Sequence, residues 1–76
     1  MPYIPIPKGS ILEQYEKYRV IGEHQVWRHK KRFFSWDGLH GEIEVFNSNG
    51  IHLGAIDPIT GVQTKKAVKG RTLNVR

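Results

Sequence analysis

The stretch Trp36-Asp37-Gly38-Leu39-His40-Gly41-Glu42-Ile43-Glu44-Val45-Phe46 lies near the centre of the chain and decides its fold. Polar and apolar residues alternate here with a period of two, which is typical of a β-strand. Ile43 and Val45 would point into a hydrophobic core. The opposite, solvated face would carry three polar side chains: His40, Glu42 and Glu44. The pattern therefore predicts a strand with one apolar face and one polar face.

The polar face of this strand has two interpretations. An antiparallel strand with one solvated face often carries glutamates that serve only solubility. His40 favours a second interpretation, because histidine transfers protons near neutral pH and here has carboxylates as neighbours. Asp37 lies just before the predicted strand, so three of the seven acidic residues of a chain with net charge +5 fall in one short segment. Acid–base chemistry is therefore a candidate function.

Length and composition set further bounds. The 76 residues fit one small domain. The chain has no cysteine, so neither a disulfide framework nor a thiolate zinc site is expected. No apolar run approaches the roughly 18 residues that a membrane-spanning helix needs, and the N-terminus lacks the order of a signal peptide. We expect a domain without a cofactor, a bound metal or a membrane span.

Positive charge is concentrated in two segments. The first is Arg28 to Arg32, which lies among aromatic residues, and the second is Lys65 to Arg76, which contains no acid. Such clusters usually form a solvated surface, but basic and aromatic residues together also suit a nucleic-acid backbone. A basic helix on a membrane fits less well, because the run has no helical apolar stripe. The side chains predicted to contact RNA are Arg28, Lys30, Lys31, Arg32, Trp36, Lys65, Lys66 and Lys69.

Residues 1–9 are predicted to form an extended arm or linker. Pro2, Pro5 and Pro7 alternate there with apolar residues. Proline has no N–H to donate, so this spacing disfavours both a helix and a central strand. We therefore place a single folded domain at residues 10–76.

A short helix is predicted to follow the arm. Ser10 and Glu13 have the spacing of a capping box, in which the serine hydroxyl accepts from a first-turn amide and the glutamate accepts from the serine amide. About two turns are expected, with one face packed on a sheet and Gly22 marking the end of the region. The apolar residues with the i, i+4, i+7 spacing of that face are Ile11, Tyr15 and Tyr18.

The remainder of the chain has the signals of strands and tight turns. Asn49-Gly50 is the strongest hairpin signal, and Asp57-Pro58 with Gly61 and Lys69-Gly70 mark two further turns. The predicted strands are Gln25 to His29, Arg32 to Trp36, Glu42 to Phe46, Ile51 to Ile56, Val62 to Ala67 and Arg71 to Val75. The first two segments could instead form one bent strand. The predicted fold class is α+β, mainly β, with a short N-terminal helix packed on a highly twisted antiparallel meander.

A set of residues between Trp36 and Gln63 closely resembles the cytotoxic domain of the ribosome-inactivating colicins and cloacin. The resemblance spans about residues 33–76 and needs no gap between Trp36 and Gln63. The residues that carry it are Trp36, Asp37, His40, Gly41, Glu42, Glu44, Gly50, His52, Leu53, Gly54, Asp57, Pro58, Thr60, Gly61 and Gln63.

The resemblance implies an endoribonuclease that cuts 16S ribosomal RNA in the decoding site without a metal ion. It implies the small ribosomal subunit as target, and an acidic immunity protein that neutralises the toxin in the producing cell. The toxin would be secreted or delivered by a producing bacterium and would act in the cytoplasm of the target cell. We expect the free domain to be a monomer.

The same resemblance assigns roles to individual residues. It implies that Asp37, His40 and Glu44 are catalytic, that Arg71 contributes to cleavage from the basic tail, and that Glu42 supports them. Strand geometry leaves the identity of the general base open. Side chains two residues apart on a strand are about 7 Å apart and those four residues apart about 13 Å, which favours Glu42 over Glu44 as the partner of His40.

Other functions remain open from the sequence. His52 could combine with Asp37 and the glutamates in a metal site, as in a metal-dependent nuclease. The chain could also be a basic RNA-binding module without catalysis, or a domain that docks on an acidic protein. His24 and His29 are expected on the surface or facing RNA.

Overall fold

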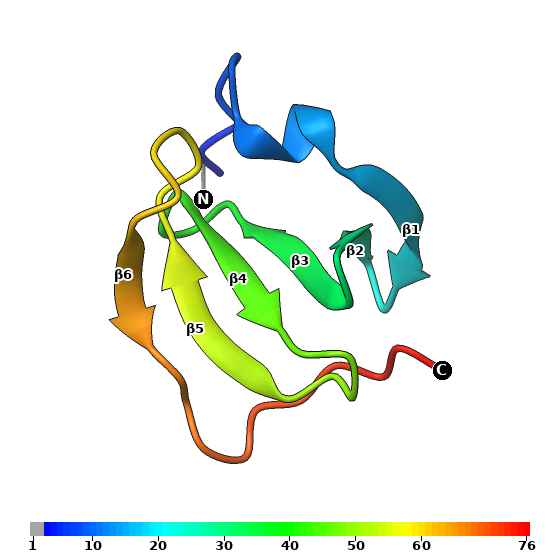
Figure 1. Ribbon diagram of the computed structural model, residues 1–76. Coiled ribbons are helices and arrows are strands. Elements are labelled where there is room, and N and C mark those ends of the chain that lie inside the picture. The colour runs from blue at the N-terminus through cyan, green and yellow to red at the C-terminus, as the bar shows by residue number, and fades with distance from the viewer. Residues whose placement is uncertain (1–2) are drawn as a thin grey trace.

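The computed structural model describes residues 3–76, which form a six-stranded antiparallel sheet. The strands are hydrogen-bonded in chain order, each to the next, so the sheet is a meander. In Figure 1 the edge strands β1 and β6 lie at opposite sides of the sheet. The mainly β character and the antiparallel meander predicted from the sequence are confirmed. The strands are β1 (Glu16–Ile21), β2 (His24–His29), β3 (Arg32–Asp37), β4 (Glu42–Phe46), β5 (His52–Ile56) and β6 (Gln63–Lys66).

The predicted N-terminal helix is wrong. The segment forms a single 3-10 turn, η1 (Ile11–Gln14), and Tyr15 already has an extended backbone with φ −99° and ψ 154°. The Ser10 hydroxyl caps this turn by accepting from the Leu12 amide at 3.1 Å, as a capping serine does. Glu13, however, accepts from the amide of Gly9 and not from that of Ser10.

Strand β1 occupies the place where the helix was expected to continue. Ile11 and Tyr15 pack against one core cluster, whereas Tyr18 packs against another. Their helix-like spacing was misleading, because these side chains belong to two different faces of a sheet. Gly22, expected to end the helix, instead begins the tight β1–β2 turn with φ 63°.

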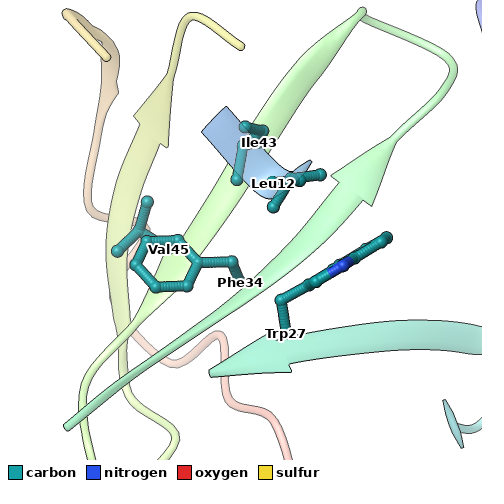
Figure 2. Packing of buried hydrophobic residues seen from close by; sticks show 5 residues of the cluster. All are labelled: Leu12, Trp27, Phe34, Ile43 and Val45. Atoms are coloured by element: carbon teal, nitrogen blue, oxygen red, sulfur yellow. The ribbon is translucent and has the colours of Figure 1, made fainter. Parts of the chain in front are cut away.

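The sheet carries a hydrophobic cluster on each face. In the first cluster, Leu12 of η1 covers side chains from β2, β3 and β4 (Figure 2). The second cluster lies on the opposite face, where Phe33 pairs with Phe46 across β3 and β4. Val75 from the C-terminal segment covers it. The buried residues of the first cluster are Leu12, Trp27, Phe34, Ile43 and Val45, and those of the second are Val26, Phe33, Phe46 and Val75.

The hairpin predicted at Asn49-Gly50 is confirmed. Strands β4 and β5 pair antiparallel, and β4 has the bounds predicted for it. The side chain of Asn47 accepts from the amides of Asn49 at 2.9 Å and Ile51 at 3.0 Å. These bonds satisfy two backbone amides of the turn that joins the strands.

The predicted strand from Arg71 to Val75 is wrong. Within the described residues this segment contributes one isolated bridge, between Thr72 and Ile51. The chain then leaves β5 and runs past the β4–β5 hairpin towards β1 (Figure 1), where the Tyr18 hydroxyl donates to the Val75 carbonyl at 2.7 Å. Burial of Val75 in the second cluster draws the segment away from the sheet edge, so a continuous ladder does not form.

Candidate active site

Asp37 and His40 form the first part of the site. Asp37 ends β3, and His40 lies in the turn of residues 38–41 that leads to β4. The Oδ2 atom of Asp37 lies 2.7 Å from Nδ1 of His40. Its Oδ1 atom accepts from the amides of Leu39 at 3.1 Å and His40 at 3.2 Å. One carboxylate therefore holds both the ring and the backbone of His40.

The prediction that His40 shares a strand face with the glutamates is wrong, because His40 precedes β4 and lies in the turn. The four-residue strand spacing therefore does not describe its distance from Glu44. Gly41 has φ 69°, a conformation that glycine adopts without strain, and this reverses the chain after His40. Because a carboxylate accepts the bond at Nδ1, the Nε2 atom of His40 is the nitrogen left for a substrate.

The pKa of Asp37 is lower than its usual value of 3.8. Burial alone would raise this pKa, but hydrogen bonds from the side chain and backbone of His40 outweigh that effect. The charge of His40 and the Leu39 amide lower the pKa further. Asp37 is therefore a carboxylate at neutral pH and places a negative charge beside the His40 ring.

Glu44 is the centre of the second part of the site. It lies on the polar face of β4 as predicted, but it is buried and not solvated, with a side chain that is 12% exposed. Its Oε1 atom accepts from Nη1 of Arg71 at 3.1 Å. Its Oε2 atom lies 2.5 Å from Nε2 of His52. The C-terminal segment that carries Arg71 therefore covers the carboxylate expected to act as a base.

His52 is a site residue whose contact with Glu44 the sequence did not predict. It is buried and pairs with Phe46 in the β4–β5 register, away from the turn that holds His40. The Val68 amide donates to its Nδ1 atom at 2.9 Å, so the ring proton is on Nε2 and points at Glu44. The hairpin predicted at Asn49-Gly50 could have indicated this contact. It pairs His52 with Phe46, which lies two residues from Glu44 on β4.

Glu42 lies between the two parts of the site. It pairs directly with Asp37 across β3 and β4. The Nζ atom of Lys65 on β6 lies 3.3 Å from its Oε2 atom. This contact is an ion pair without hydrogen-bond geometry, and Oε2 is buried with no hydrogen-bond partner among residues 3–76.

Three carboxylates thus meet on one face of the sheet. In antiparallel pairing, directly opposed side chains such as Asp37 and Glu42 have Cβ atoms about 5 Å apart. Glu44 follows two residues along β4, a rise of about 7 Å. Lys65 and Arg71 supply positive charge to this cluster. The structure therefore brings together the residues assigned to catalysis and support.

Some residues predicted to bind RNA are engaged within the protein. Arg28 forms an ion pair with Glu16, with 2.6 Å between Nη2 and Oε1. The indole N–H of Trp36 donates to the Ile4 carbonyl at 2.8 Å. Lys65 is paired with Glu42, as described above. Lys66 and Lys69 are exposed. They lie in the same C-terminal segment as Arg71, which contains no acidic residue.

Lys30, Lys31 and Arg32 lie at the tip of the β2–β3 hairpin. The two lysines have left-handed backbone conformations, with φ 47° and φ 64°, which are uncommon for residues with side chains. Lys30 and Arg32 line a groove of about 510 Å³. In the same groove the ring of His29 stacks on Tyr15, with 4.4 Å between centroids. The sequence did not predict this groove, because Tyr15 was expected in a helix.

The metal-binding group considered around His52, with Asp37 and the glutamates, does not form among residues 3–76. Both ring nitrogens of His52 are engaged, one by Glu44 and one by the Val68 amide. Among residues 3–76, no group of three or more histidines, aspartates and glutamates is arranged to hold a metal ion. In the same part of the chain, no helix has the length and apolarity required to cross a membrane.

The fold and the site place the chain in the class of small antiparallel β-sheet proteins, with a carboxylate–histidine pair and a carboxylate–arginine pair on the sheet. Comparison with known families identifies the class: the family model described as Cytotoxic matches residues 19–74, and the chain belongs to this family. The resemblance to the cytotoxic domain noted from the sequence is thereby confirmed.

Two curated relatives agree with this assignment. Cloacin of Escherichia coli is 51% identical over 37 residues, which are 47% of this chain and 7% of cloacin. Colicin E3 of Escherichia coli is 43% identical over 47 residues, which are 58% of this chain and 8% of the colicin. The matched segments therefore span less than a tenth of the length of either relative.

Proposed function

We propose that residues 10–76 form an endoribonuclease toxin domain that cleaves 16S ribosomal RNA at the decoding site and so blocks translation. The observation that carries the proposal is that Asp37, which holds His40, and Glu44, which pairs with Arg71, lie on the neighbouring strands β3 and β4. Membership of the Cytotoxic family and the similarity to cloacin and colicin E3 support it.

The reaction that suits these residues is transesterification by acid and base. Glu44 takes the proton from a ribose 2′-hydroxyl, and the 2′ oxygen attacks the adjacent phosphorus. Arg71 stabilises the negative charge of the phosphorane. His40 protonates the leaving 5′ oxygen through Nε2, while Asp37 holds the ring at Nδ1. The products are a 2′,3′-cyclic phosphate and a free 5′-hydroxyl.

The surroundings of the two glutamates favour Glu44 as the base. Arg71 and His52 each contact one oxygen of Glu44 and so fix the direction of its carboxylate. Arg71 lies beside the same carboxylate, where it can reach the phosphate that the 2′ oxygen attacks. Among residues 3–76, Glu42 has no such pair of hydrogen bonds and has Lys65 as its counter-charge, which suits a supporting role.

The remaining basic residues suit binding to the ribosome. Lys30, Lys31, Lys66 and Lys69 are exposed and face solvent, so their charges can meet RNA phosphates. An acidic immunity protein would complement the same net charge of +5. We propose that the domain is a monomer when free and is delivered by a producing bacterium to the cytoplasm of a target cell.

Incubation with purified ribosomes tests the proposal. We expect one new end near the 3′ terminus of the small-subunit RNA, carrying a 2′,3′-cyclic phosphate. Cleavage should persist in EDTA, because the proposed site moves protons without a metal ion. His40→Ala is the inactive variant, and His24→Ala, an exposed histidine outside the site, is its matched control.

Three results would contradict the proposal in different ways. Activity that EDTA removes and a divalent ion restores would indicate a metal-dependent nuclease. Ribosome binding without a new RNA end would indicate a non-catalytic RNA-binding module. Cleavage by His40→Ala at the parental rate would show that the site is not the one described.

A further inference from the structure

The N-terminal arm contacts the turn that presents His40. The Ile4 amide donates to the Gly38 carbonyl at 2.7 Å. The Ile4 carbonyl accepts from the indole N–H of Trp36 at 2.8 Å. Trp36 and Gly38 are the two sequence neighbours of Asp37. Ile4 therefore uses both of its backbone hydrogen-bonding groups to bridge the residues on either side of the carboxylate that holds His40.

The surfaces of arm and turn also fit closely. A Cβ atom at Gly38 would lie 2.8 Å from Cδ1 of Tyr3, so the absence of a side chain lets the Tyr3 ring approach the turn. At the other end of the turn, a Cβ atom at Gly41 would lie 3.1 Å from Cδ1 of Ile4. In Figure 1 the dark blue N-terminal segment accordingly reaches the connection between β3 and β4.

The arm is suited to holding a fixed position. Pro5 and Pro7 limit its backbone freedom, so less conformational entropy is lost when it docks. The family match begins at residue 19, so the arm lies outside the segment shared with the Cytotoxic family. The family assignment therefore does not depend on the arm.

We propose that Ile4 is a positioning residue for catalysis, which holds the turn of residues 38–41 so that Asp37 orients the His40 ring towards the leaving oxygen. This role rests on the proposed ribonuclease function. Ile4 does not touch the reacting atoms and acts through the backbone around Asp37. Small displacements of a catalytic group lower the rate of the chemical step more than they lower substrate binding.

The arm offers a matched pair of substitutions in the chain of residues 1–76. Ile4→Pro removes the N–H that donates to Gly38. Ile6→Pro is the control, because Ile6 is also an isoleucine followed by proline, and its amide donates no hydrogen bond within residues 3–76. Gly38→Ala disturbs the same contact from the other side, since its new methyl group would displace the Tyr3 ring.

Two readouts test the role. Amide hydrogen exchange at Leu39 and His40, which both donate to Asp37, should become about 3- to 10-fold faster in Ile4→Pro and Gly38→Ala, as expected for loss of one net hydrogen bond. The kcat for rRNA cleavage should fall about 10-fold while KM changes by less than about 2-fold. Ile6→Pro should match the unaltered chain in both measurements.

Exchange and kcat in Ile4→Pro that equal those of Ile6→Pro would overturn the proposal. A rise in KM at constant kcat would also overturn it, because the arm would then serve binding. If the unaltered chain does not cleave ribosomal RNA, the ribonuclease function fails, and the exchange rates alone decide whether the arm holds the turn.

Discussion

The Nε2 atom of His52 lies 2.5 Å from Oε2 of Glu44, and both residues are buried. The Val68 amide occupies the other ring nitrogen, so His52 acts as a neutral donor to the carboxylate. Glu44 therefore has a fixed orientation before any substrate binds. A group whose direction is set in advance loses less entropy when it reacts, which is the physical advantage of this buried pair for a general base.

His52→Ala should lower the free energy of unfolding by about 2–4 kcal/mol, because it leaves Glu44 Oε2 and the Val68 amide without their partners. Urea unfolding monitored by tryptophan fluorescence measures this difference. His24→Ala is the control, since His24 is exposed, and it should stay within about 0.5 kcal/mol of the unaltered chain. Equal stability of the two variants would show that the buried contact is not formed in solution.

The two glutamates can be separated by Glu44→Gln and Glu42→Gln. As the base, Glu44 should be essential, so Glu44→Gln should slow rRNA cleavage by about 100- to 10,000-fold. Glu42→Gln should slow it less, as expected for the supporting role that we propose for Glu42. Rates are compared on ribosomes at equal folded fraction. A nearly inactive Glu42→Gln with a normal Glu44→Gln would reverse the two assignments.

Glu44→Gln should also destabilise the fold, whereas the same substitution at a solvated position would change the stability little. Arg71 and His52 both donate to this side chain, whereas an amide has one acceptor oxygen and would turn an N–H towards one of the donors. We expect a loss of about 1–3 kcal/mol, measured by urea unfolding. Glu42→Gln, whose Oε2 atom lacks a hydrogen bond among residues 3–76, should lose less.

Stability should depend on pH through Asp37. Its pKa in the folded state is below the usual 3.8, so the unfolded chain binds the proton more tightly. The stability that Asp37 contributes is therefore fully present above about pH 4 and is lost as the pH falls through the lowered pKa. Asp37→Asn should flatten the acid limb of a plot of unfolding free energy against pH. An unchanged acid limb would mean that the Asp37–His40 contact is absent in solution.

Lys30 and Lys31 should contribute to RNA affinity at some expense of stability. Each phosphate contact adds roughly 0.7 to 0.9 to the slope of log affinity against log salt, so replacing both lysines with alanine should flatten that slope. Filter binding to rRNA fragments at several salt concentrations measures it. Lys31→Gly should stabilise the fold by up to about 1 kcal/mol, because glycine adopts the φ of 64° without strain. An unchanged salt slope would assign the hairpin tip to solvent.

The sequence by itself determined the features that depend on neighbours along the chain. The alternation from Glu42 to Phe46 defined β4, and Asn49-Gly50 defined its hairpin with β5, because a turn sets the register of the strands beside it. Asp37 and His40 are three residues apart, so one turn is enough to join them. The family resemblance was carried by the same local segments.

Only the tertiary structure decided what depends on distant parts of the chain. Tyr15 and Tyr18 have helical spacing, yet they pack against opposite faces of the sheet, and this burial outweighs the local preference. Burial also outweighs the local strand pattern of the C-terminal segment, which leaves the sheet edge because Val75 is buried in the second cluster. That path brings Arg71 to Glu44 across 27 positions of sequence. Contacts over such separations depend on how the whole sheet packs, and no local pattern encodes them.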